Sequence, residues 1–584
     1  MKQDSNIIKK DPKKFIKKPN LFAYDKEYKE FSWEKAEKEY LDFFKDGSLN
    51  ASYIAIDRHA KGKNASKNAL LFESATGERE IYTYAQLKEL TNKFANVLSK
   101  HGIEKGDRVF IFLPTTPERL VVFFGILKLG AIAGTLFSAF MEMALMDRLL
   151  DSGAKVVVTN AQLFPRIQKI WKDLPALEKV IIVERGSVDL PKEKNIIYYN
   201  QEMKKASADF AIAHMKKDDF SYMLYTSGTT GKPKGVVHAH GDILQAMVTT
   251  KFVLDVHEDD IYWCTADLGW VTGVVYGALG PFGLGATSVI YEGRFSPENW
   301  YKVLQDNKVT VWYTAPTAIR MLMGSAVSPK EYNLSHLRFL ASVGEPLNPE
   351  AIWWGLQAFG LPFHDTWWQT EQGSITVTNY SVMDVRPGSM GKPLPGVVAA
   401  IIDEEGNELA NGEEGHLALK PETIYSLMKQ IWGNKEKFDS YFRNGWYLSG
   451  DKAFKDTDGY FWFVGRADDV IKTSGERVGP FEVESALVEH EDVIEAGVIG
   501  KPDELRGEII KAFVVVKPGI EKNEETKKRI MAYVKQHLAG HAYPREIEFI
   551  EKLPKTRSGK IMRRLLKARE LGLPEGDTST LEDY

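Results

Sequence analysis

The segment Tyr225–Gly241, which reads YTSGTTGKPKGVVHAHG, combines hydroxyl, glycine and lysine residues in a pattern suited to binding phosphate. Hydroxyls can donate to phosphate oxygens, glycines let backbone amides approach an anion, and lysines supply positive charge. The segment is not a Walker A loop, because Pro233 stands where that pattern has Ser or Thr after the lysine. A plain Ser/Thr/Gly linker would not order two lysines around a proline in this way. The candidate phosphate-binding residues are Thr226, Ser227, Gly228, Thr229, Thr230, Gly231, Lys232 and Lys234.

Five further motifs follow this loop along the chain. They read VGEP (Val343–Pro346), DTWWQTE (Asp365–Glu371), YLSGD (Tyr447–Asp451), GRADDVIKTSGERVGPFEVE (Gly465–Glu484) and PKTRSGKIMRR (Pro554–Arg564). Together with the loop, they make the chain resemble the adenylate-forming superfamily of acyl-CoA synthetases, peptide-synthetase adenylation domains and luciferases. Within that superfamily, CTADLGWVTG (Cys264–Gly273), YTAPTAIR (Tyr313–Arg320) and the doubled tryptophan of DTWWQTE resemble the acetyl-CoA synthetase branch.

This resemblance implies an AMP-forming acetate–CoA ligase, which converts ATP, acetate and CoA to acetyl-CoA, AMP and diphosphate through acetyl-adenylate. The first step joins two anions, so positioning and positive charge matter more than acid–base catalysis. A propionate or other short- or medium-chain acyl-CoA synthetase remains an alternative, as does the same enzyme run in reverse. A non-catalytic sensor of adenylate or acyl-CoA is disfavoured, because a sensor has no need of the adenylation lysine that the resemblance assigns to Lys560.

The resemblance makes Lys560, Glu371 and Thr226 the catalytic residues. Lys560 would bridge the substrate carboxylate and the α-phosphate, which Thr370 would also contact. Glu371 would help to hold Mg²⁺, a hard cation that prefers carboxylate and phosphate oxygens. Besides the phosphate loop, the residues implied in nucleotide binding are Gly344, Glu345, Pro346, Asp365, Thr366, Trp367, Trp368, Gln369, Thr370, Asp451, Arg466 and Arg477.

The same resemblance implies the acyl and CoA sites. The acyl pocket would be lined by Trp270, Val271, Thr272, Val343 and Trp368, with the indole of Trp368 closing it after about two or three carbons. CoA would contact Thr272, Ala315, Ser474, Gly475, Arg166 and Lys535. A second Mg²⁺ would be held at Val488, His490 and Val493, and Asp468 matches the hinge about which the C-terminal part turns between the two reaction steps.

The distribution of apolar residues indicates an α/β fold. Apolar runs at 107–113, 155–159 and 179–184 alternate with amphipathic helical patterns such as 83–102, which is typical of parallel sheets covered by helices. The charge-free stretch 268–291 holds many glycines, so we expect a turn, a short buried helix and a strand there rather than a membrane span. We expect a flexible basic arm at 1–20, a large α/β domain of several subdomains at 21–467 and a small mobile α+β domain at 468–584.

The net charge and the cysteine count bear on the partners and the location of the protein. Lys and Arg number 76 against 80 Asp and Glu, a net charge of −4, and this argues against nucleic acid as a partner. The single cysteine, Cys264, excludes an intrachain disulfide and fits a reducing, cytoplasmic location. The expected partners are therefore the small-molecule substrates, with no membrane. A lysine acetyltransferase or deacetylase acting on Lys560 is a further possibility.

Overall fold

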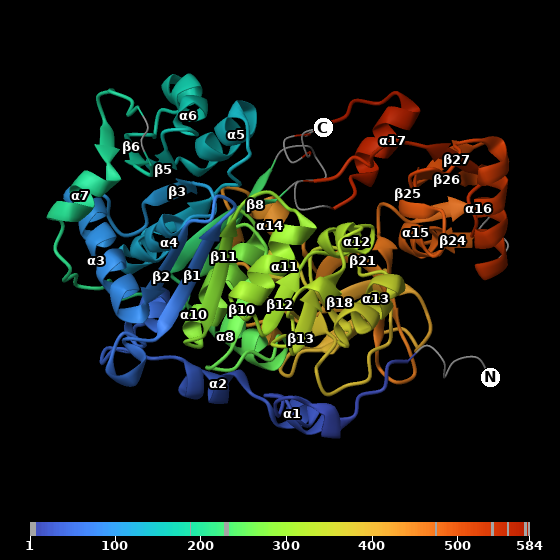
Figure 1. Cartoon of the computed structure of the whole chain (residues 1–584), viewed down its shortest axis with the longest axis horizontal. Helices are drawn as coiled ribbons and strands as arrows, with labels where there is room; N and C mark the ends of the chain where they lie inside the picture. Colours follow the sequence, from blue (N-terminus) through green and yellow to red (C-terminus); the bar gives the residue numbers. More distant parts are fainter. Residues whose placement is uncertain are drawn as a thin grey trace.

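A computed structural model describes residues 7–186, 189–226, 233–473, 476–538, 542–556, 560–576, 578 and 581. The phosphate-loop residues Ser227–Lys232, the CoA-site residues Ser474 and Gly475, and the side chain of Arg477 lie outside the described part of the chain. The α/β architecture expected from the sequence is confirmed. Figure 1 shows a large body of sheets and helices, with a smaller C-terminal domain beside it.

The longest sheet runs through the body and is parallel in its middle part, where β1, β11, β10, β12, β13 and β14 lie side by side. Several of these strands are buried along their whole length, as expected where helices cover both faces of a parallel sheet. In spatial order its strands are β17 (Ala399–Ile402), β18 (Gly415–Leu419), β21 (Trp446–Lys455), β22 (Phe461–Arg466), β16 (Ser389–Pro393), β15 (Val377–Thr378), β14 (Phe363–Trp367), β13 (Phe339–Ser342), β12 (Val311–Thr314), β10 (Ile261–Cys264), β11 (Thr287–Glu292), β1 (Asn68–Ser74) and β2 (Arg79–Thr83), with β20 (Phe442–Arg443) beside β21.

A second sheet contains the apolar runs that were recognised in the sequence. The expected strands form as β3, β5 and β6, and they pair in parallel. The order is β19 (Gln430–Ile431), β9 (Lys234–Ala239), β8 (Phe220–Thr226), β4 (Ile132–Thr135), β3 (Arg108–Phe112), β5 (Val156–Asn160), β6 (Lys179–Val183) and β7 (Ile196–Tyr198).

Helices surround these sheets (Figure 1). The helical pattern at 83–102 forms a helix that starts in a capping box, in which Thr83 Oγ1 accepts from the amide of Gln86 and the Gln86 side chain accepts from the amide of Thr83. The helices of the body are α1 (Tyr24–Glu30), α2 (Trp33–Tyr40), α3 (Tyr84–Lys100), α4 (Pro117–Leu129), α5 (Glu142–Ser152), α6 (Phe164–Ile170), α7 (Tyr199–Lys205), α8 (Ile243–Phe252), α9 (Val271–Val274), α10 (Gly280–Gly283), α11 (Pro297–Asp306), α12 (Pro316–Met323), α13 (Pro349–Phe359) and α14 (Lys435–Asp439).

The charge-free stretch 268–291 folds as expected into short elements. It forms α9, one turn of π-helix at Val275–Leu279, α10 and the strand β11. Across the described ranges of the chain, none of the helices combines the length and the apolar character that crossing a membrane would require.

The C-terminal domain has its own sheet and its own apolar core. The core is formed mainly by residues of β25, β26 and the two helices packed on them, including Leu487, Val498, Val514 and Ile530. Its strands lie in the order β24 (Glu476–Val478), β23 (Ile471–Thr473), β26 (Gly507–Val516) and β25 (Val493–Asp503), with β27 (Glu546–Phe549) beside β26. Its helices are α15 (Pro480–Val488), α16 (Glu524–His537) and α17 (Arg563–Leu571).

The basic N-terminal segment differs from the flexible arm expected from the sequence. Its residues from Ile8 to Asn20 lie against the body, and Ile8 is buried and pairs with Val385 in an antiparallel bridge. Lys9 forms an ion pair of 3.0 Å with Asp384, whose carboxylate also accepts from the amide of Lys10 at 2.9 Å. At least Lys9 and Lys17 of this segment therefore bind specific carboxylates of the body, which composition alone could not reveal.

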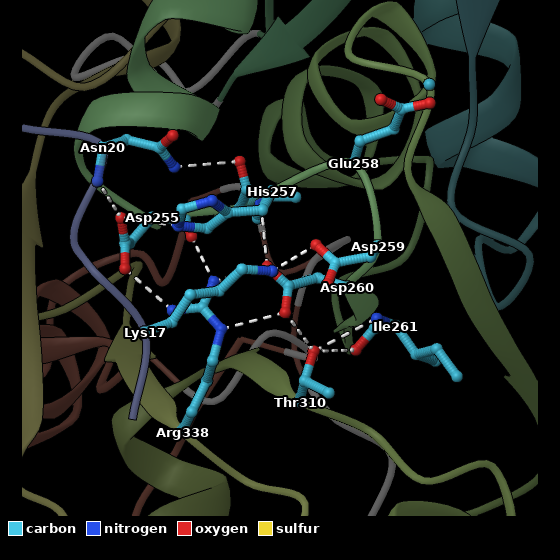
Figure 2. A network of polar contacts seen from close by, with 12 residues as sticks. Lys17, Asn20, Asp255, His257, Glu258, Asp259, Asp260, Ile261, Thr310 and Arg338 are labelled. Atoms are coloured by element: carbon cyan, nitrogen blue, oxygen red, sulfur yellow. Dashed lines mark hydrogen bonds and ion pairs between the residues drawn. The ribbon is translucent and has the colours of Figure 1, made fainter. Parts of the chain in front are cut away.

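Figure 2 shows the second anchor of this segment, a polar network centred on Arg338. The guanidinium donates to Asp255 at 2.7 Å and to Asp260 at 2.9 Å. The amide of Asn20 donates to the other oxygen of Asp255 at 2.7 Å, and Lys17 forms an ion pair with Asp259. Asn20 of the N-terminal segment therefore binds the same carboxylate, Asp255, as Arg338, which directly precedes β13.

Candidate active site

The parallel strands gather the sequence motifs at one edge of the long sheet. Because β10, β12, β13 and β14 are adjacent and parallel, the segments that leave their carboxyl ends must lie together. Thr272, Ala315, the segment 343–346 and the segment 368–371 all follow these strands. Residues that are far apart in the chain are therefore brought to the carboxyl ends of adjacent strands.

The phosphate loop connects two antiparallel strands of the second sheet. Thr226 ends β8 and faces Lys234 at the start of β9, so the two residues pair across the mouth of the loop. Within the described part of the chain, the Thr226 hydroxyl is buried and has no hydrogen-bond partner. A buried hydroxyl with an unused hydrogen-bonding capacity at the base of a loop is a suitable donor for a bound phosphate oxygen.

Glu371 is buried beside Lys234 and Tyr441. Lys234 Nζ lies 2.8 Å from Glu371 Oε1, and the Tyr441 hydroxyl donates to the same oxygen at 2.9 Å. Burial alone would raise the pKa of Glu371, but the charge of Lys234 outweighs it and the pKa is lowered. Glu371 is therefore ionised at neutral pH, in the state required to bind a cation.

The surroundings of Glu371 fit one Mg²⁺ shared with phosphate oxygens. Both described contacts of the carboxylate use Oε1, so among the described residues Oε2 can serve a cation. No group of three or more His, Cys, Asp and Glu residues in the described part of the chain could form a complete protein cage. Mg²⁺ commonly binds through one or two carboxylates together with substrate phosphates, and this arrangement matches that habit.

Asp451 forms the centre of a second polar cluster. Its carboxylate accepts from Arg466 at 2.8 Å and from the indole nitrogen of Trp367 at 2.9 Å, and Gln369 lies 3.3 Å away. Burial raises the pKa of Asp451, and Arg466 opposes this effect. A buried carboxylate that is fixed by three donors can accept hydrogen bonds from a ribose without moving.

The residues implied in adenine binding lie after β13 and along the second half of β14 and the segment that follows it. The Glu345 carboxylate accepts from the amide and hydroxyl of Thr317, at 3.1 and 2.5 Å, and from Arg320 at 3.0 Å, which fixes the segment 344–346. Asp365 is buried in the middle of β14, and burial raises its pKa to about 8. At pH 7 its carboxyl is therefore mostly neutral.

The two tryptophans implied in the acyl pocket pack in different aromatic groups. The ring of Trp368 meets the buried ring of Tyr276 edge-on, at 5.2 Å between centroids and an interplanar angle of 84°. The Tyr276 hydroxyl accepts from the amide of Ile375 at 2.8 Å and contacts Thr249 at 2.9 Å, so the wall behind Trp368 is rigid. Trp270 instead packs with Phe137 and Phe140.

Lys560 comes from the C-terminal domain and lies within electrostatic range of the cluster around Asp451. The residue as a whole is exposed, whereas its ammonium is crowded by protein atoms. This local burial lowers the pKa of Lys560, Arg466 lowers it further, and Asp451 opposes the shift. The adenylation lysine implied by the sequence thus lies close enough to Asp451 and Arg466 for their charges to interact.

Two family models cover both domains. The model described as "AMP-binding enzyme" matches residues 56–432, and that described as "AMP-binding enzyme C-terminal domain" matches residues 482–560. The chain belongs to the AMP-binding enzyme family. The resemblance deduced from the motifs is thereby confirmed.

The relatives of this AMP-binding enzyme include several acetyl-coenzyme A synthetases. That of Bacillus subtilis (strain 168) is 54% identical over 567 residues, 97% of this chain and 98% of its own length. That of Methanothrix thermoacetophila is 43% identical and covers 93% of this chain and 86% of its own. A crystal structure of an anthranilate CoA ligase in complex with anthranoyl-AMP is 32% identical, with a TM-score of 0.83 over 90% of this chain and 98% of that one.

Two of the implied CoA residues of this AMP-binding enzyme have other contacts. Arg166, in α6, donates to the carbonyls of Ser138 and Phe140 at 3.1 and 3.0 Å. Lys535, in α16, lies over the ring of Tyr543 at 5.3 Å. Both cations therefore have partners close to their own elements in this arrangement of the domains.

The residues implied in the second metal site and the hinge lie at the end of α15, in the segment after it and in the turn between β22 and β23. His490 is buried against the ring of Tyr533, and its carbonyl accepts from the amide of Val493 at 3.0 Å. The His490 carbonyl thus already accepts one hydrogen bond. Val488 is the last residue of α15, two positions before His490. Asp468 is exposed in the turn between β22 and β23, where the chain passes from the body to the C-terminal domain.

Two residues that the sequence did not single out hold the turn that carries Glu371. Tyr441 contacts Glu371 as described above, and the buried His238 lies 2.8 Å from the carbonyl of Thr370. His238 belongs to the conspicuous segment GVVHAHG after the phosphate loop, so its position offered a signal. Tyr441 lies in a stretch without a motif and could be found only from the structure.

Proposed function

We propose that this protein is an AMP-forming acetate–CoA ligase, which makes acetyl-CoA, AMP and diphosphate from ATP, acetate and CoA through acetyl-adenylate. The observation that carries the proposal is the position of Lys560, which comes from another domain and lies near enough to Asp451 and Arg466 for their charges to act on it. A module that only bound adenylate would not need a lysine delivered in this way. The relatives named acetyl-coenzyme A synthetase support the proposal.

In the first step, acetate attacks the α-phosphorus of ATP and diphosphate leaves. The loop 226–234 would hold the β- and γ-phosphates, Asp451 would fix the ribose, and Thr370 would contact the α-phosphate. Lys560 would offset the negative charge shared by the carboxylate and the α-phosphate in the transition state. The lowered pKa of Lys560 still leaves it able to act as a cation once two anions are bound beside it.

Glu371 is the residue proposed to hold Mg²⁺, through the oxygen that Lys234 and Tyr441 do not contact. Bound there, the ion would supply positive charge to the departing diphosphate. Lys234 would share that task from the opposite strand.

A short acyl group is proposed because Trp368 is large and fixed against Tyr276. Aromatic acids need a deep pocket, and the anthranilate CoA ligase that resembles this chain carries such an acid as its adenylate. A pocket closed by a rigid indole excludes an aromatic ring by steric overlap. It discriminates less against propionate, because one methylene changes binding by only about 1–3 kcal/mol.

In the second step, the thiol of CoA cleaves the adenylate. We propose that the C-terminal domain turns about Asp468 for this step, so that Lys560 leaves and Ser474 and Gly475 take its place beside Thr272 and Ala315. Val488, His490 and Val493 stay a proposed second cation site.

A cytoplasmic location is proposed from the single buried cysteine, Cys264. Modification of Lys560 by an acetyltransferase would remove its charge and switch off the first step.

Replacing Lys560 tests this assignment. Lys560→Ala should abolish acetate-dependent exchange of pyrophosphate into ATP, because the cation that offsets charge in the first step is gone. It should leave thiolysis of supplied acetyl-adenylate within about twofold of the native rate. Unchanged exchange in the variant would refute the role of Lys560, and absence of exchange in the native protein would refute the function.

A further inference from the structure

Arg320 is buried where the two domains meet. It lies in α12 of the body, only 8% exposed, and it lines a cavity between the domains together with Glu345, Glu495 and Lys560. An arginine that is so little exposed is normally paired, because its charge cannot be removed by deprotonation. Its partners therefore indicate what it does.

The guanidinium joins the proposed adenine segment to the C-terminal domain. One nitrogen, Nη2, donates to Glu345 Oε2 at 3.0 Å and to the Thr317 hydroxyl at 2.9 Å. On another side, Nε lies 3.9 Å from Oε1 of Glu495, which is 9% exposed and belongs to β25. A rigid planar cation with several donors is suited to hold two carboxylates at once.

A second polar contact, through Asn348, also joins the body to the C-terminal domain. Arg320 Nη1 donates to Asn348 Oδ1 at 3.3 Å, and the amide nitrogen of Asn348 donates to the hydroxyl of Ser485 at 2.9 Å. Ser485 belongs to α15 of the C-terminal domain. Both contacts exist only while the C-terminal domain has its present orientation.

The far end of this chain of contacts reaches the adenylation lysine. Glu495 Oε1 accepts from Lys555 Nζ at 2.6 Å. Lys555 pairs with Ile561 in an antiparallel bridge, and the amide of Thr556 donates to the carbonyl of Lys560 at 2.7 Å. Glu495 therefore fixes the base of the turn from which Lys560 extends.

We propose that Arg320 is a positioning residue for the adenylation step, and that it acts by holding Glu495 so that Lys560 is presented to the active site. The inference rests on the proposed function. Because Arg320 also holds Glu345, the orientation of the C-terminal domain is coupled to the segment proposed to bind adenine. When the domain turns for thiolysis, Arg320 keeps Glu345 and Thr317 but loses Glu495.

The test replaces Glu495, which spares the contact of Arg320 with Glu345. Glu495→Gln should lower the turnover number of acetate-dependent pyrophosphate exchange about tenfold, with the KM for ATP changed less than about twofold. Thiolysis of supplied acetyl-adenylate should stay at the native rate, because it uses the other orientation. Glu495→Asp, which keeps the charge, should recover most of the exchange activity.

Glu570→Gln is the matched control. Glu570 is buried to a similar degree, with a side chain 14% exposed against 11% for Glu495, and it pairs with Lys501 at 2.9 Å inside the C-terminal domain. Its replacement should leave both half-reactions unchanged. Equal loss of both half-reactions in Glu495→Gln, or the same loss in the control, would mean a merely structural role and overturn the proposal.

A measurement of distance separates failure of this inference from failure of the proposed function. Cys264 is buried and is the single cysteine, so spin labels can be attached at Lys330→Cys in the body and Lys528→Cys in α16. With ATP present, Glu495→Gln should broaden the distribution of label distances relative to the native chain. An unchanged distribution overturns the inference whatever acids the enzyme activates, whereas a native protein without exchange activity overturns the proposed function.

Discussion

At the scale of single residues, the proposed site sets the ionisation of its carboxylates by different means. Glu371 is kept charged by Lys234 in spite of burial, whereas the pKa of Asp365 is raised to about 8 by burial. Glu371 is the residue proposed to bind Mg²⁺, and Asp365 lies in the strand whose backbone is proposed to contact adenine. This difference follows from the neighbours of each residue, not from its place in the motif DTWWQTE.

Asp365 gives a pH dependence whose sign can be worked out. Between about pH 4 and pH 8 the folded chain holds a proton that the unfolded chain has lost, so this group lowers stability as the pH rises. Asp365→Asn cannot ionise and removes the effect. The variant should gain at least about 1 kcal/mol over the native protein on going from pH 5 to pH 9.

Urea denaturation at pH 5, 7 and 9 measures this difference. The gain should increase up to pH 8 and then level off. A difference between the two proteins that stayed constant over the whole range would show that Asp365 does not carry the raised pKa.

At the scale of elements, the sequence predicted those whose pattern is local. The strands β3, β5 and β6 are short apolar runs, and α3 has an amphipathic pattern preceded by a capping box. The order of strands in the long sheet could not be predicted, because it joins β16 to β22 across about 70 intervening residues. The motif VGEP follows the strand β13, and the motif YLSGD lies within β21. Tyr441 and Glu495 belong to none of the recognised motifs, so their roles could be found only from the structure.

The N-terminal segment shows why a charge pattern misleads. The run of lysines predicts a solvated arm. In the structure, the Lys9 ammonium and the Lys10 amide both donate to Asp384, more than 370 positions later in the chain. Only the folded body brings these partners together. The anchor is an element of tertiary structure that no local pattern indicates.

Asp384→Ala tests this anchor. Loss of the contacts to Lys9 and Lys10 should lower the free energy of unfolding by about 1–2 kcal/mol and allow trypsin to cleave after these lysines in the otherwise native protein. Asp439→Ala removes an exposed ion pair with Lys435 inside α14 and should cost less than about 0.5 kcal/mol. If trypsin cleaved the native and Asp384→Ala proteins equally fast, the segment would not be held by this carboxylate.

At the scale of the whole molecule, the site depends on the orientation of two domains. The body supplies the phosphate loop, Glu371 and Asp451, and the C-terminal domain supplies Lys560. The polar contacts of Arg320 and Asn348 with Glu495 and Ser485 hold this arrangement. Polar contacts of this kind break more readily than an apolar interface, which suits the proposed turning of the C-terminal domain.

The central claim is that this chain activates acetate, and a panel of carboxylates tests it most directly. Pyrophosphate exchange and CoA-dependent release of AMP would be measured for acetate, propionate, butyrate and benzoate, in the native enzyme and in Trp368→Gly. We predict that acetate has the highest kcat/KM in both assays, that propionate follows within about a hundredfold, and that the variant prefers longer acids. A native enzyme that activates benzoate or butyrate better than acetate, or one whose preference Trp368→Gly leaves unchanged, would contradict the account.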